Sequence, residues 1–191
     1  MKEIKMIKKL LFFILFLGCT HDFVENKVFL EPEDDSDFFQ VLEPASRKAE
    51  LFLNFKTIFI INATLLSDKV LESIKLRQDS MGTSFGESMV KDNNLFFMSL
   101  FEPNSLFKKF DPDIWTIYVM LGQKKVEMSK VQYLRKEKLW SRFFPYINNW
   151  SKEYFVLFEK KDKEMILDYV KKGKTVKLVI ANDKGQSSLK W

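Results

Sequence analysis

The first twenty residues constrain this chain most strongly, because they separate a leader from the part that can fold. Four lysines, at positions 2, 5, 8 and 9, precede an eight-residue apolar run from Leu10 to Leu17. A secretory signal has an apolar core of about 7–15 residues, whereas a membrane-spanning helix needs about 20. The run therefore fits an export signal and is too short to span a bilayer.

The apolar run is followed by Gly18 and by Cys19, the only cysteine in the chain. A small residue followed by a lone cysteine resembles the lipobox of bacterial lipoproteins, although Phe16 and Leu17 are bulkier than its usual residues. The resemblance covers about the first twenty residues. It implies that residues 1–18 are removed and that Cys19 carries acyl chains that hold the protein in the cell envelope. In a cell with two membranes, Thr20 after the cysteine, in place of an aspartate, implies the outer membrane rather than the inner one. The alternatives are an ordinary signal peptide with a chance cysteine and an uncleaved anchor.

Charge divides the rest of the chain into two parts. The net charge of +5 includes +3 from residues 1–18, which leaves +2. Residues 20–46 hold eight acids against one lysine and so carry −7, which leaves +9 for residues 47–191. Prolines and clustered acids are typical of a flexible spacer. We therefore predict an acidic tether over 19–46 and a single globular domain over 47–191. The end of the tether is expected to dock through Phe38, Phe39, Val41 and Leu42.

Alternating apolar residues predict strands over much of this domain. Residues 48–66 are expected to form one long strand or two with a bend, with a buried helix as the alternative. Hairpin turns are expected at Gly122–Gln123 and over 182–185. The remaining predicted strands cover residues 94–102, 114–121, 126–134, 154–158, 176–181 and 186–191.

Three further segments are expected to be helical. Ser67 and Asp68 can cap a helix that runs to about Gln78. Residues 136–147 cluster large apolar side chains before a proline, and residues 164–172 precede a glycine. Together with the strands, this pattern predicts a mainly β domain, an antiparallel β-sandwich of the immunoglobulin-like type with helical insertions. An open antiparallel α+β sheet is the alternative. Twenty phenylalanines predict a core rich in that residue.

Residue types exclude several classes of chemistry from the domain. The only histidine, His21, lies in the predicted tether, so a Ser-His-Asp triad and a His-ligated zinc site are excluded. The glycine patterns that bind nucleotide phosphates are absent. Asp111 and Asp113 are of the type used in carboxylate catalysis, but their spacing around Pro112 favours a turn. No catalytic residue, metal site or cofactor is therefore predicted.

Lysines and arginines are dense between residues 108 and 142, with aromatic residues among them. In an exported protein the available anions are lipid head groups, lipopolysaccharide and wall polymers, so nucleic acid is not an expected partner. A solvated face that keeps the domain soluble is the simpler interpretation. The candidate contacts with an anionic surface are Lys124, Lys125, Arg135, Lys136, Lys138 and Arg142.

These observations favour a lipid-anchored envelope protein that acts as a non-catalytic binding or structural module. Its expected partners are the membrane, through acyl chains on Cys19, and another envelope protein or an anionic envelope polymer. A carrier for an apolar ligand is the second hypothesis, because aromatic β domains can enclose lipid. A carboxylate-dependent hydrolase of envelope polymers is the third.

Overall fold

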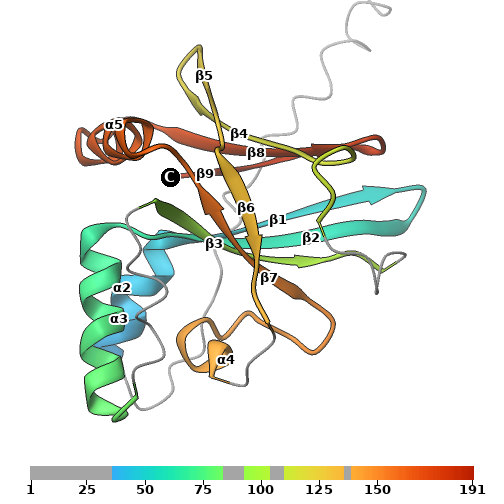
Figure 1. The fold of residues 1–191 in the computed structure, drawn as a ribbon. Helices are drawn as coiled ribbons and strands as arrows, with labels where there is room; N and C mark the ends of the chain where they lie inside the picture. The colour runs from blue at the N-terminus through green and yellow to red at the C-terminus, as the bar shows by residue number, and fades with distance from the viewer. Residues whose placement is uncertain (1–35, 84–92, 104–109, 136–138) are drawn as a thin grey trace, which may run out of the picture.

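The computed structural model of the chain describes residues 36–83, 93–103, 110–135 and 139–191. These residues are mainly β, as predicted, and form two antiparallel sheets that do not close into a barrel (Figure 1). The first sheet has five strands in the order β1 (Ser46–Leu53), β2 (Lys56–Leu65), β3 (Asn94–Phe101), β7 (Lys152–Leu157) and β6 (Lys130–Tyr133). The second has four, in the order β5 (Lys124–Glu127), β4 (Thr116–Leu121), β8 (Val176–Asn182) and β9 (Gly185–Lys190).

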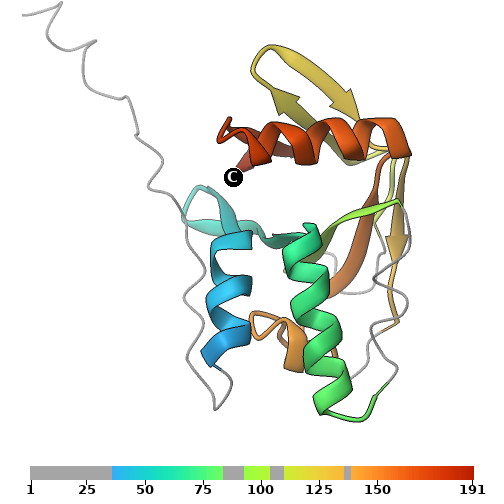
Figure 2. The ribbon, with the colours of Figure 1, turned by 90° about the vertical axis from the view of Figure 1, so that its left-hand side faces the viewer.

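Four helices accompany the sheets in the described part of the chain. They are α2 (Ser36–Ala45), α3 (Asp68–Ser80), α4 (Trp140–Phe143) and α5 (Lys160–Lys171). Figure 2 shows α2 and α3 side by side beneath the first sheet, while α5 lies on the other side, next to the second sheet. The first sheet is therefore covered on both faces.

One core cluster joins the two sheets. It takes Ile61 and Met98 from the first sheet, Val119 and Leu178 from the second, and Ile166 from α5. All five side chains are at most 1% exposed. Burial of such apolar surface is the main favourable term in folding, at about 25 cal/mol per Å². This cluster therefore fixes the second sheet and α5 to one face of the first.

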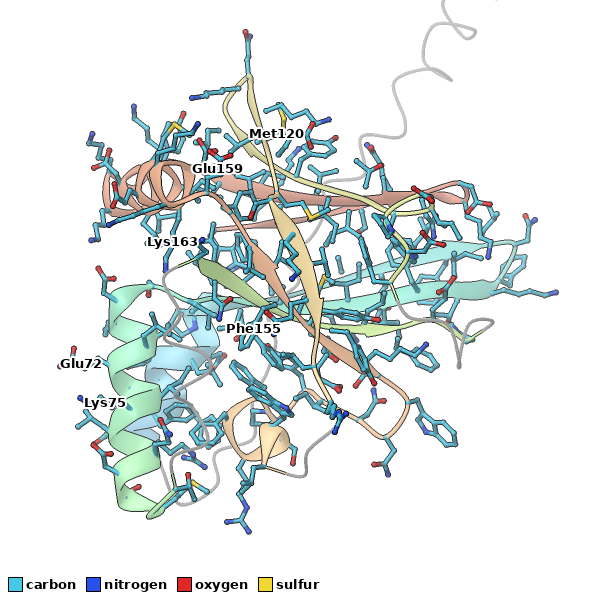
Figure 3. The ribbon with its side chains drawn as sticks, in the orientation of Figure 1. Glu72, Lys75, Met120, Phe155, Glu159 and Lys163 are labelled. Carbon is cyan, nitrogen blue, oxygen red and sulfur yellow. The ribbon has the colours of Figure 1, made fainter. Side chains whose placement is uncertain are left out.

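A second core cluster lies on the opposite face of the first sheet, against α2, α3 and α4. Phe97 from β3 stacks on Phe144, which follows α4, with ring centroids 3.7 Å apart. Phe155 from β7, labelled in Figure 3, belongs to the same cluster. Along β3, Phe96 and Met98 face the first cluster and Phe97 faces the second. The predicted phenylalanine-rich core is thus two clusters with a strand between them.

The predicted tether ends earlier than expected. Residues 36–45 form α2, in which Phe38, Phe39 and Leu42 are at most 4% exposed. The expected docking of Phe38, Phe39 and Leu42 is confirmed, and Val41, the fourth expected contact, is half-buried. Residues 36–45, which were assigned to the tether, thus pack on the domain as a helix. A helix forms because the apolar side chains recur at helical spacing and bury one face. Pro44 lies in the last turn and does not prevent it.

Residues 48–66 form a hairpin rather than one strand. β1 pairs with β2 from Ser46 opposite Thr64 to Leu53 opposite Lys56, which leaves Asn54 and Phe55 as the turn. The expectation of two strands with a bend is closest to this arrangement. The buried-helix alternative is wrong.

The return strand expected over 126–134 is two strands in different sheets. β5 pairs with β4, and after Ser129 the chain pairs with β7 as β6. The amide of Ser129 donates to the carbonyl of Leu157 at 2.8 Å, so the change of sheet happens at this residue. The apolar residues change phase at this corner, from Val126 and Met128 to Val131 and Tyr133, and the expectation of one continuous strand overlooked that change.

The helices differ from expectation mainly in length. The helix expected over 136–147 is confined to the four residues of α4 in the part that the structure describes. The helix expected over 164–172 is α5, which begins four residues earlier and is followed by Gly173 at φ +67°. The helix capped by Ser67 is confirmed as α3, with Val70 and Ile74 buried.

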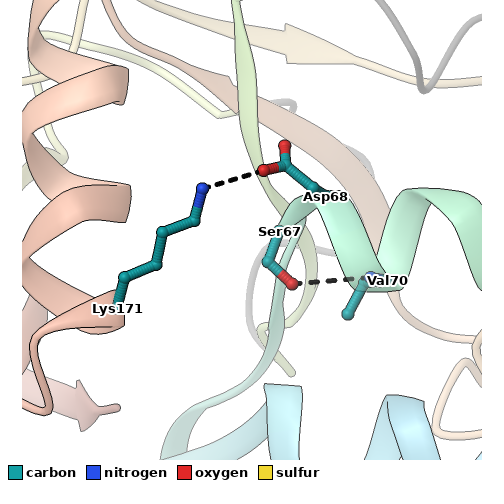
Figure 4. A network of polar contacts seen from close by, with 4 residues as sticks. All are labelled: Ser67, Asp68, Val70 and Lys171. Atoms are coloured by element: carbon teal, nitrogen blue, oxygen red, sulfur yellow. Dashed lines mark hydrogen bonds and ion pairs between the residues drawn. The ribbon is translucent and has the colours of Figure 1, made fainter.

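A polar contact joins the helices that lie on opposite sides of the first sheet (Figure 4). Ser67 Oγ accepts a hydrogen bond from the Val70 amide at 3.4 Å, and the next residue, Asp68, forms an ion pair with Lys171 of α5 at 3.0 Å. Both charged side chains are mostly exposed, so the pair contributes at most about 1 kcal/mol. The position of α5 is therefore set mainly by its buried Ile166 and Leu167.

Candidate functional site

The tip of the β1–β2 hairpin presents three large apolar side chains to solvent. Phe52, Leu53 and Phe55 are 56%, 49% and 107% exposed. The tip lies at the right-hand edge of Figure 1, away from both core clusters. Contiguous exposed apolar side chains of this kind mark contact surfaces more often than single ones do.

The backbone of the tip adopts a conformation that suits glycine better than phenylalanine. Asn54 and Phe55 have φ angles of +50° and +60°. A two-residue hairpin turn with both φ values positive favours Asn-Gly, because a β-carbon is unfavourable at positive φ. Asn tolerates this region, whereas a bulky residue there is an outlier. The fold therefore holds a phenylalanine where glycine would be more stable.

The exposed tip begins where the support from the rest of the fold ends. Leu51 packs against the first core cluster and against the β8–β9 turn, where a β-carbon on Gly185 would come 3.0 Å from Leu51 Cδ2. The register of β1 and β2 shifts between Leu51 and Phe52. Such a bulge redirects the side chains that follow.

The tip also carries the positive charge of Lys56, and no acidic residue lies close to it in the sequence. Lys56 is exposed, and residues 51–57 contain no aspartate or glutamate. The nearest acid along β1, Glu50, forms an ion pair with Lys48. The surface is thus apolar and cationic together.

A second candidate surface is a groove of about 430 Å³ along α2 and α3. Phe38 and Val41 of α2 and Leu76 of α3 supply its apolar lining. The Arg77 guanidinium lies 4.6 Å over the Phe38 ring. Figure 3 shows Glu72, another lining residue, on the outer side of α3. The groove is open and its rim is charged, so it fits a segment of protein better than an enclosed lipid.

A recess lined by aromatic residues lies near Trp150, which is 66% exposed. Its volume of about 10 Å³ is room for one water molecule. Burial raises the pKa of Tyr154 in its wall to about 12, although the Phe110 amide donates to the hydroxyl oxygen at 3.0 Å. Burial also lowers the pKa of Lys152, and the charge of Glu102 opposes that shift. The recess is too small for an organic ligand.

Three hydroxyl groups form a cluster next to the second core. Ser46 and Thr64 are hydrogen bonded at 2.6 Å, and Thr64 and Tyr146 at 2.7 Å. Burial raises the pKa of Tyr146 above its ordinary value of 10.0, and the bond with Thr64 offsets part of the shift. The cluster joins β1 and β2 to the loop after α4. It satisfies polar groups that would otherwise be costly to bury.

The structure does not bring the predicted basic residues together. Lys124 and Lys125 lie in β5, at the top of Figure 1, whereas Arg135 follows β6 and Arg142 lies in α4 at the bottom. Lys125 forms an ion pair with Glu127, and its Nζ lies 4.4 Å over the Tyr118 ring. Lys136, Lys138 and the predicted lipidation residue Cys19 lie outside the described residues. Contact with an anionic surface stays a prediction, separately for the pair Lys124 and Lys125 and for the pair Arg135 and Arg142.

The two aspartates considered for catalysis form a turn. Asp111 Oδ1 accepts a hydrogen bond from the Asp113 amide at 3.0 Å, and the Asp111 carbonyl accepts one from the Trp115 amide at 2.9 Å. Both side chains are exposed. This is the local bonding expected of an aspartate that starts a turn.

Sequence reasoning missed the hairpin tip. Apolar residues at 51, 53, 55, 59 and 61, with Thr57 between them, keep a two-residue period across the turn and concealed it. The available signal was Asn54, which follows three consecutive apolar residues, 51–53, and favours a turn.

Within the described ranges no helix is long and apolar enough to cross a membrane. The same ranges contain no group of three or more His, Cys, Asp or Glu side chains that could hold a metal ion. No family model matches the chain, and no curated protein or solved structure is similar to it.

Proposed function

We propose that the protein is a bacterial lipoprotein, acylated at Cys19, that acts in the cell envelope as a non-catalytic binding module. The observation that carries the proposal is the order of segments: a basic start, an apolar run of eight residues, Gly18-Cys19, an acidic segment and a folded domain from Ser36. An unpaired thiol in an exported protein is a liability that acylation removes. By the same resemblance, the outer membrane is the favoured location.

The surfaces of the domain support binding better than chemistry. The α2–α3 groove offers apolar side chains within a charged rim, the composition of a site for a protein segment. We propose another envelope protein as the partner of this groove. An anionic envelope polymer is the alternative, in contact with Lys124 and Lys125 or with Arg135 and Arg142.

The two other hypotheses stay predictions. A carrier would need an enclosed apolar cavity, and the described phenylalanines with the least exposure pack against one another in the two clusters. A hydrolase would need two carboxyl groups across one cleft, and Asp37 and Glu72 are the acids that line the α2–α3 groove. The immunoglobulin-like arrangement of the two sheets is likewise still a proposal.

Metabolic labelling with a fatty acid tests the anchor. We expect the label on the parent chain and no label on Cys19→Ala, with loss of the variant from the membrane fraction. Ser36→Ala, a matched change at the start of the domain, should keep the label. A parent protein recovered from the cytosol with Met1 intact and a free sulfhydryl would contradict the proposal.

A further inference from the structure

We infer that the β1–β2 hairpin tip, residues 52–56, is a second and non-covalent membrane contact that inserts into the bilayer holding the acyl chains of the same molecule. The inference rests on the proposed anchor at Cys19, which supplies that bilayer. It adds an interaction surface on the folded domain, which would then meet the membrane in one orientation.

The strained backbone is the first argument. Phe55 is held at φ +60° with its side chain fully exposed, so it makes no packing contribution that would offset the strain. Strained residues persist at sites of function because the surrounding structure enforces them. The pairing of Leu53 with Lys56 on either side of the turn enforces this one.

The chemistry of the tip matches the boundary between acyl chains and head groups. Interfacial segments bury aromatic and leucine side chains about 5–10 Å deep and keep lysines at the level of anionic head groups. Phe52, Leu53 and Phe55 supply the apolar part and Lys56 the cation. The tip is a protruding turn at the edge of the domain (Figure 1), so it can enter the interface without burying the rest of the domain.

The length of the connecting chain permits the contact. Residues 20–35 separate Cys19 from the start of α2 and can span at most about 55 Å when extended. The ten residues of α2, about 15 Å long, and the eight residues of β1, about 26 Å long, separate that start from the tip, so the extended connecting chain is longer than the two elements together. Because the anchor keeps the domain near the bilayer, the effective concentration of lipid is high and a weak contact is enough.

The test places a polarity-sensitive thiol probe at the tip of the full, acylated protein by Phe55→Cys. The protein is reconstituted into vesicles of phosphatidylethanolamine and phosphatidylglycerol, with and without a lipid that carries a nitroxide quencher. Leu76→Cys is the matched control, because Leu76 is also apolar and 65% exposed but lies on α3. An acylated Cys19 has no free thiol, so each chain should take up one probe.

We expect the probe at residue 55 to shift to shorter wavelength and to be quenched several-fold more strongly than the probe at residue 76. Adding Phe52→Asp to the Phe55→Cys chain should abolish most of this difference. If quenching survives that change, the probe itself drives insertion and the inference is wrong.

The remaining outcomes separate the inference from the anchor. A vesicle-bound protein with equal quenching at residues 55 and 76 overturns the membrane contact and leaves the anchor intact. A blue shift at residue 55 without lipid quenching means that a protein surface or a second copy covers the tip, which also overturns it. Two probes per chain and no protein on the vesicles would instead refute the anchor, and the inference with it.

Discussion

At the residue scale, two buried tyrosine hydroxyls make the free energy of unfolding fall as pH rises through the alkaline range. Burial raises the pKa of Tyr154 from 10.0 to about 12 and raises that of Tyr146 as well. In the unfolded chain both protons leave near pH 10, whereas the folded chain retains them. The stabilisation is therefore complete below pH 10 and is lost as pH rises toward 12. Each tyrosine contributes a slope of at most about 1.4 kcal/mol per pH unit in that window.

Chemical denaturation measured between pH 8 and 12 checks this expectation, with Tyr154→Phe as the comparison. Below pH 10 the variant should differ from the parent by a constant amount, because it loses only the bond from the Phe110 amide. Above pH 10 its free energy of unfolding should fall less steeply than that of the parent. A parent whose stability does not change across this range would show that the hydroxyls titrate normally.

Single residues also show what the sequence could and could not reveal about the site. Phe52 and Phe97 are the same residue type in strand-like patterns, yet one is 56% exposed and the other fully buried. Burial depends on which strands pair, and pairing is a long-range property that local pattern does not contain. Cys19 is a different case: its predicted acylation rests only on its immediate neighbours in the sequence, and the residue lies outside the described part of the chain.

At the scale of the element, the positive φ of Phe55 at the tip destabilises the β1–β2 hairpin. Phe55→Gly should raise the free energy of unfolding by about 1 kcal/mol, because glycine adopts positive φ without a penalty. Phe55→Ala is the matched control, since it also removes the ring but keeps the β-carbon and should bring little gain. Thermal unfolding of the three proteins measures the difference. Equal midpoints for Gly and Ala would mean that the turn is unstrained.

The elements differ in how well the sequence predicts them. α3 and the β8–β9 hairpin follow from capping and turn residues within a few positions, and both were expected nearly in full. β5 and β6 were expected as one strand, although the apolar positions change phase between Met128 and Val131, where the chain changes sheet. The length of α2 was hidden by the prolines and acids around it, although its buried face was correctly identified. Local signals therefore gave the elements, and tertiary pairing set their boundaries.

On the scale of the whole molecule, Trp191 joins the end of β9 to the end of α2. Its Nε1 donates to the Ala45 carbonyl at 2.7 Å, and its ring lies 5.1 Å from that of Phe96. Trp191→Ala should cost about 3 kcal/mol, the lower end for a large aromatic residue, because the side chain is only partly buried. Trp150→Ala is the control and should change stability by less than about 0.5 kcal/mol, since its ring is mostly exposed.

Urea titration of both variants gives the comparison, with unfolding followed by circular dichroism so that loss of a tryptophan does not affect the signal. A Trp191→Ala protein as stable as Trp150→Ala would mean that the junction between β9 and α2 adds nothing to the fold.

The mainly β class was predictable from alternation alone. The division of the core into two clusters was not, because residues on both faces of β3 and β7 are apolar and the pattern of a doubly covered strand is nearly continuous.

The position of β3 has a consequence for how the molecule comes apart. Neighbouring residues of this strand, Phe96 and Phe97, belong to different clusters. Neither cluster can therefore unfold without displacing the strand that the other cluster packs against. A partly unfolded form that keeps one half intact is accordingly disfavoured, and the domain is expected to melt as one cooperative unit. Amide hydrogens along β3 should then exchange with solvent only when the entire domain opens, more slowly than those at the hairpin tip.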